Sequence, residues 1–154
     1  MECRLKLIKE DGGKPADATL YRRVIGSLRY LVNTRPNIAH AVGIVSRFME
    51  KPSTHHWAAV KQILRYIKGT MSYGCTYRAG NGDAHLLGFS DSDHGGDVGD
   101  RKSTSGQVFF LGKNLITWSS QKQRIVALSS CEAEYVAACA ATCQGVWLNS
   151  LLAD

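Results

Sequence analysis

The amino-acid sequence predicts an α/β fold of the α+β type, in which a helical N-terminal half precedes antiparallel strands and one long helix. Between residues 19 and 70, apolar residues recur at intervals of three and four, the period of an amphipathic helix. After Gly69 the period shortens to about two, until an alanine-rich segment at 130–152 restores the helical period. We therefore expect an irregular arm at 1–18, a helical segment at 19–70 and a mixed segment at 71–154.

The first half is expected to form three helices. The first begins near Thr19, a candidate N-cap, and ends at Arg35-Pro36, because proline disfavours the helical conformation of the residue before it. The second opens at this proline, and the third begins after a cap at Ser53 or Thr54 and ends before Gly69. The residues expected to face the core are Leu20, Val24, Leu28, Leu31, Val32, Ile38, Val42, Val45, Phe48, Met49, Trp57, Val60, Leu64 and Ile67.

The second half carries the signals of an antiparallel meander followed by a helix. Turn residues at 81–83 and 113–114 separate short apolar runs, and such spacing is typical of hairpin-connected strands. The expected strands are 73–77, 86–90, 105–111 and 115–118. The final helix has a capping box, with Ser129 as the N-cap residue and Glu132 at the third helical position.

Charge is distributed unevenly along the chain. Residues 1–80 contain 14 Lys and Arg against 5 Asp and Glu, a net charge of +9, whereas residues 81–154 contain 5 against 8, a net charge of −3. A cationic half suits a polyanion, because phosphate neutralisation dominates the electrostatics of nucleic-acid binding. The same charges also fit the solvated faces of helices. The candidate nucleic-acid-binding residues are Arg22, Arg23, Lys61, Arg65 and Lys68.

Two carboxylates are candidates for a metal-dependent site. Asp91 lies at the end of the strand expected at 86–90, with Asp93 close by, and Glu134 lies one turn into the long helix. Cleavage of a phosphodiester by two divalent cations requires several acids that converge from different elements. The acids around Asp91 also fit a solvated turn that contains glycine.

Several long motifs resemble copia-type retrotransposon Pol polyproteins. The run Gly-Phe-Ser-Asp-Ser-Asp-His-Gly-Gly-Asp at 88–97 resembles the ribonuclease H motif of that family. Further matching segments are found at 100–106, 118–123 and 127–135. Upstream, the segments at 21–31, 34–39, 56–61 and 64–70 resemble the part of the reverse transcriptase that follows the polymerase palm.

The resemblance implies a ribonuclease H-like fold at 71–154 and a segment like the reverse transcriptase thumb or connection at 19–70. In that family, three or four carboxylates hold two Mg²⁺ or Mn²⁺ ions, which cleave the RNA strand of an RNA–DNA hybrid. The motif match places the first carboxylate on Asp91 and the second on Glu134, because Tyr135-Val136-Ala137 follows it as in the family's pattern. Asp93 is a further candidate metal ligand, whereas Glu132 is already used in the capping box.

The family's third carboxylate lies on a strand that follows the long helix, and this sequence contains no matching segment after 152. We therefore expect an incomplete ribonuclease H-like fold, with a site that is catalytically incomplete by itself. We also expect an unpaired sheet edge that recruits a protein partner or a second copy of the chain.

The sequence indicates an intracellular protein, cytoplasmic or nuclear. Its N-terminus is charged, no apolar run long enough to span a membrane is evident, and the five cysteines include no CxxC pair. Two functions follow: a transposon-derived module that binds nucleic acid or protein without catalysis, or a metal-dependent ribonuclease H acting on RNA–DNA hybrids. A third possibility is a transposon remnant with no selected role. The missing third acid favours the binding module.

Overall fold

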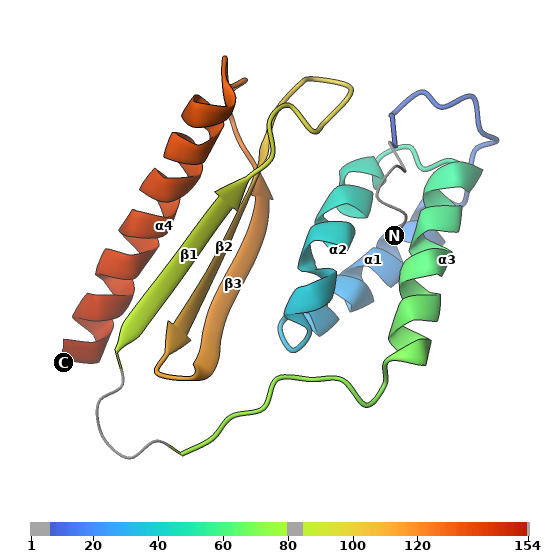
Figure 1. The fold of residues 1–154 in the computed structure, drawn as a ribbon. Coiled ribbons are helices and arrows are strands. Elements are labelled where there is room, and N and C mark those ends of the chain that lie inside the picture. The colour runs from blue at the N-terminus through green and yellow to red at the C-terminus, as the bar shows by residue number, and fades with distance from the viewer. Residues whose placement is uncertain (1–6, 80–84, 154) are drawn as a thin grey trace. The chain divides into compact units, whose positions relative to one another are not determined.

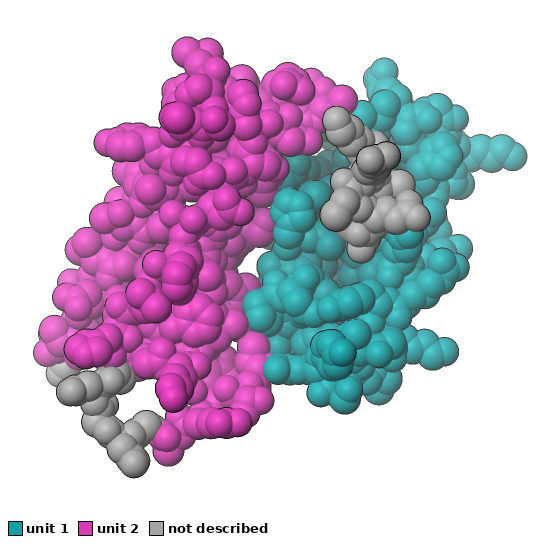
Figure 2. All heavy atoms as spheres, in the orientation of Figure 1, with its two compact units in different colours: residues 1–74 teal, residues 75–154 magenta. Residues whose placement is uncertain are grey.

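The structure is a computed structural model that describes residues 7–79 and 85–153. The chain separates into two compact units, residues 1–74 and residues 75–154, which Figures 1 and 2 show. The turn expected at 81–83 lies outside the described residues. We describe each unit by itself.

Unit 1 is helical. Asp17, not Thr19, is the N-cap of the first helix, because its carboxylate accepts hydrogen bonds from the backbone N–H groups of Thr19 and Leu20. We expected one continuous second helix. Its α-helical part is short and is flanked by a tighter 3₁₀ turn at each end. The elements are α1 (Ala18–Val32), η1 (Pro36–Ile38), α2 (Ala39–Val45), η2 (Ser46–Phe48) and α3 (Thr54–Gly69).

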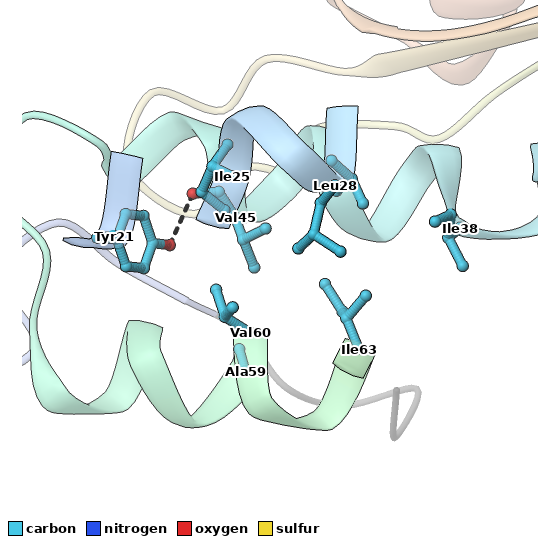
Figure 3. Close-up of a cluster of buried hydrophobic side chains, with 9 residues drawn as sticks. Tyr21, Ile25, Leu28, Ile38, Val45, Ala59, Val60 and Ile63 are labelled. Carbon is cyan, nitrogen blue, oxygen red and sulfur yellow. Dashed lines mark hydrogen bonds between the residues drawn. The ribbon is translucent and has the colours of Figure 1, made fainter. Parts of the chain in front are cut away.

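The three helices of unit 1 enclose an apolar core, shown in Figure 3. The phenol of Tyr21 donates a hydrogen bond of 2.8 Å to the carbonyl oxygen of Val45, which joins α1 to α2. The expected positions Leu20 and Leu64 are exposed instead, and their neighbours Tyr21 and Ile63 are buried in their place. The buried cluster consists of Tyr21, Ile25, Leu28, Ile38, Val42, Val45, Ala59, Val60 and Ile63.

A capping box fixes the start of α3. The sequence predicted a cap at Ser53 or Thr54 but did not identify its partner, His56. Ser53 is the N-cap and His56 is its reciprocal partner, since Nδ1 of His56 accepts a hydrogen bond from the backbone N–H of Ser53. The buried imidazole stacks on Phe48, and its Nε2 lies 2.9 Å from the carbonyl oxygen of Ile8. This histidine therefore links the N-terminal arm to α3.

Unit 2 consists of a three-stranded antiparallel sheet in the order β1-β2-β3 and the long helix α4. The meander is confirmed, but the strand expected at 73–77 is not formed, and those residues have no partner strand within the described chain. The third strand is longer than expected because its polar end pairs with the start of β2. The elements are β1 (Leu86–Ser92), β2 (Thr104–Leu111), β3 (Asn114–Lys122) and α4 (Ser130–Ala153).

Helix α4 lies against β1 and β2 (Figure 1). The ring of Phe109 lies between Gly88 of β1 and Gly145 of α4, and a Cβ added at Gly88 would lie 2.5 Å from that ring. Only glycine at this position of β1 therefore leaves room for the phenylalanine between sheet and helix. Side chains that share the face of Gly88 point towards α4, and those that alternate with them point away.

Helix α4 is the one described helix that is long and apolar enough to cross a membrane, judged by length and composition alone. From the sequence we expected no such segment, because its apolar runs are interrupted well before the roughly 18 residues that a span needs. A helix that covers a sheet can meet the same criterion, and α4 buries Ala133, Ala137 and Leu148.

Candidate carboxylate site and basic helices

Asp91 lies near the end of β1, opposite Gly106 of β2. Strand alternation places it on the sheet face opposite α4, because Gly88, Ser90 and Ser92 occupy the face that the helix covers. Its side chain is exposed, and it has no hydrogen bond or ion pair with any described residue. The absence of a side chain on Gly106 leaves the space beside the carboxylate open.

Glu134 projects from the first turns of α4 and is also exposed, with no partner among the described residues. Its neighbour Glu132 is occupied, because its carboxylate accepts a hydrogen bond of 2.6 Å from the backbone N–H of Leu128. The hydroxyl of Ser129 accepts a bond from the backbone N–H of Glu132, as the capping box predicts. Glu132 is therefore engaged at the start of α4, whereas Glu134 is not.

Asp93, the third predicted metal ligand, is engaged in holding a loop. One of its carboxylate oxygens accepts hydrogen bonds from the backbone N–H groups of Thr104, at 2.8 Å, and Gly96, at 3.3 Å. A carboxylate that satisfies two backbone donors has less capacity to bind a cation. Asp93 shapes the turn after β1.

An ion-pair cluster that sequence inspection missed stabilises the loop between β1 and β2. The ammonium of Lys122 lies 2.6 Å from a carboxylate oxygen of Asp97 and 2.8 Å from one of Asp100. Burial alone would raise the pKa of Asp97, but hydrogen bonds from Lys122 and from the backbone of Gly99 and Asp100 lower it to about 2. The same ion pairs raise the pKa of Lys122, although burial opposes this shift. No local sequence pattern could identify the cluster, because Lys122 comes from β3.

The described residues give an incomplete ligand set for a divalent cation. Among residues 7–79 and 85–153, no group of three His, Cys, Asp or Glu side chains is placed to hold a metal ion. Mg²⁺ binds in octahedral oxygen coordination, and a two-cation site needs more acids still. Asp91 and Glu134 are free carboxylates of the right chemistry, but they supply only part of such a site.

The five predicted nucleic-acid-binding residues are exposed on unit 1. Lys61, Arg65 and Lys68 are separated by four and three residues, so that they lie on one side of α3. Arg22 and Arg23 project from α1. Within the described residues none of the five has an ion-pair partner.

Comparison with known proteins identifies relatives among transposon polyproteins. The chain is 47% identical over 135 residues to the Retrovirus-related Pol polyprotein from transposon TNT 1-94 of Nicotiana tabacum, covering 87% of this chain and 10% of the polyprotein. It is 42% identical over 149 residues to the Retrovirus-related Pol polyprotein from transposon RE2 of Arabidopsis thaliana, again covering 10% of that protein and 97% of this chain. These similarities support an origin of the chain in a transposon Pol polyprotein.

This Pol segment spans about a tenth of the length of the transposon polyproteins that it matches. It is also 48% identical over 131 residues to a much shorter protein, the Secreted RxLR effector protein 161 of Plasmopara viticola, covering 84% of this chain and 91% of that protein. No family model matches the Pol segment. No solved structure matches it either.

Proposed function

We propose that this Pol segment is a ribonuclease H-like module that binds nucleic acid, with an RNA–DNA hybrid as its preferred ligand, and does not cleave RNA by itself. The observation that carries the proposal is the row of cations at Lys61, Arg65 and Lys68, which have no ion-pair partner among residues 7–79 and 85–153. Residues 51–80 contain no Asp or Glu, so these cations have no acidic neighbour on α3. Exposed and unpaired lysines and arginines are the side chains that neutralise phosphates.

The test is binding of a labelled RNA–DNA hybrid, measured by fluorescence anisotropy over a range of salt concentrations. We expect the variant with Lys61→Gln, Arg65→Gln and Lys68→Gln to bind more weakly. Its plot of log affinity against log salt concentration should be shallower by about 0.9 for each phosphate that these side chains neutralise in the parent chain. A matched control removes the same charge elsewhere, through Lys9→Gln, Lys51→Gln and Lys113→Gln, all exposed. Equal weakening in the two variants would show that net charge alone attracts the hybrid.

A second candidate is a metal-dependent ribonuclease H that cleaves the RNA strand of the hybrid. The observation that favours it is the pair of partnerless carboxylates at Asp91 and Glu134. Bound Mg²⁺ or Mn²⁺ would supply an activated water and charge stabilisation. The two residues alone would hold such an ion weakly, because most of its ligands would have to be water.

The sheet edge formed by β1 supports a protein partner as well. Among the described strands β1 pairs only with β2, so its other edge has free backbone N–H and carbonyl groups. A strand of a partner protein, or of a second copy of the chain, could extend the sheet there. Such a partner could also bring the carboxylates that the site lacks.

A further inference from the structure

The side-chain amide of Gln123 lies where the sheet and α4 meet. Gln123 follows the last residue of β3 and is 6% exposed. Its Nε2 atom lies 3.1 Å from the Ser92 hydroxyl of β1, 2.9 Å from the Ser105 hydroxyl of β2 and 2.9 Å from the carbonyl oxygen of Ala133 in α4. One amide therefore contacts two strands and the first turn of the helix.

The orientation of this amide is set by the helix. A serine hydroxyl either donates or accepts, whereas the Ala133 carbonyl only accepts, so the NH₂ end must face it. The backbone N–H of Gln123 is held as well, because it donates a hydrogen bond of 2.8 Å to the carbonyl oxygen of Ser103. Both the main chain and the side chain of this residue are thus anchored.

The hydrogen bonds of Gln123 reach the immediate neighbours of both candidate carboxylates. Ser92 follows Asp91, and Ala133 precedes Glu134. The Oε1 atom of Gln123 is buried without a hydrogen-bond partner among the described residues. A buried polar atom without a partner is unfavourable, so an apolar side chain would fill the same space at lower cost. Packing alone does not account for a glutamine here.

We propose that Gln123 is a positioning residue that fixes the distance between the carboxylates of Asp91 and Glu134. The amide bonds the end of β1 to the start of α4, so that movement of either element would break a buried hydrogen bond. This inference rests on the second candidate function, in which Asp91 and Glu134 would each supply a ligand to a divalent cation. Gln123 acts on that site through its neighbours and does not contact the cation.

The test compares Gln123→Met, which keeps the length of the side chain and removes the amide, with Gln121→Met at an exposed position of β3. The first readout is the distance distribution between nitroxide labels on Asp91→Cys and Glu134→Cys, measured by electron paramagnetic resonance in a chain whose native cysteines are serine. We expect Gln123→Met to broaden this distribution and Gln121→Met to leave it unchanged. An unchanged distribution in Gln123→Met would overturn the proposal.

The second readout is Mn²⁺ binding to the unlabelled chain, followed through the resonance of free Mn²⁺. Residues that orient metal ligands typically contribute tenfold or more to affinity, so we expect about a tenfold weaker association in Gln123→Met. The parent chain could bind no Mn²⁺ while the label distribution still broadens in Gln123→Met. That result would contradict a cation held by both carboxylates and would support the positioning role of Gln123. Should Gln123→Met fail to fold, Ser105→Ala removes one of the three acceptors that surround the amide nitrogen. It is expected to broaden the distribution less, and no broadening there would contradict the proposal.

Discussion

In unit 1, nine apolar side chains from the helices form one buried cluster, whereas in unit 2 the fully buried apolar residues are few and include three alanines. Both units expose large apolar side chains, and unit 2 exposes more of them among the described residues. Leu87 and Phe89 are about half exposed on β1, and Tyr135 and Trp147 are more than half exposed on α4. The comparison shows a contiguous apolar core in unit 1 and fewer buried apolar residues in unit 2.

The largest expected effect tests the core of unit 1. Ile25 is completely buried between the helices, so Ile25→Ala should destabilise unit 1 by about 3 kcal/mol, through reduced burial and the cavity left behind. Trp57 reports on this core, because its ring centroid lies 5.6 Å from that of Tyr21. Denaturant unfolding followed by Trp57 fluorescence, with Trp118 and Trp147 changed to Phe, provides the measurement. A shift below about 1 kcal/mol would mean that the cluster is loosely packed.

The next effect tests the close contact between Gly88 and Phe109 in unit 2. Gly88→Ala should destabilise it by about 2 kcal/mol, because the added methyl group would collide with the ring of Phe109. The matched control is Gly106→Ala on the neighbouring strand, where the nearest atom to the new Cβ is the Asp91 carbonyl oxygen at 4.0 Å. Unfolding followed by Trp118 fluorescence should separate the two variants. Equal stability would show that the sheet and α4 are not closely packed at Phe109.

A smaller, pH-dependent effect tests the ion pairs of Lys122 with Asp97 and Asp100 in unit 2. The pKa of Asp97 is lowered from 3.8 to about 2 in the folded chain, so its ion pair stabilises the fold above pH 4 and the gain disappears between pH 4 and 2. Asp97→Asn should therefore cost about 2 kcal/mol at pH 6 and almost nothing near pH 2. Denaturant unfolding at each pH measures this difference. Asp91→Asn, at a carboxylate without a partner among the described residues, is the control and should change stability by less than about 0.5 kcal/mol.

The sequence predicted the elements whose signals are local. Ser129 marks the start of α4, because its hydroxyl accepts a hydrogen bond from the backbone N–H of Glu132 as the local motif predicts. The Glu132 carboxylate bonds the backbone N–H of Leu128, one residue before the predicted N-cap. The end of β3 was missed because Ser119-Ser120-Gln121-Lys122 lacks the apolar residues of a strand and is extended by pairing with β2. Conversely, the apolar and aromatic residues at 73–77 form no strand, since propensity alone does not supply a pairing partner.

The candidate site was predicted in the same uneven way. The positions of Asp91 and Glu134 followed from motifs, but the engagement of Asp93 with the backbone of Thr104 did not, because it depends on how the loop folds back onto β2. Gln123 had no recognisable signal in the sequence. Its partners come from β1, β2 and α4, and only the folded chain brings them together.

We propose above all that this Pol segment binds a hybrid and does not cleave it. The most direct measurement incubates one labelled RNA–DNA hybrid with the purified chain in Mg²⁺ or Mn²⁺ and records binding and cleavage in the same samples, beside Asp91→Asn and Glu134→Gln. We predict salt-dependent binding by all three proteins and an intact RNA strand in every sample. Cleavage by the parent chain that disappears in both variants would contradict this proposal and establish a working ribonuclease H site.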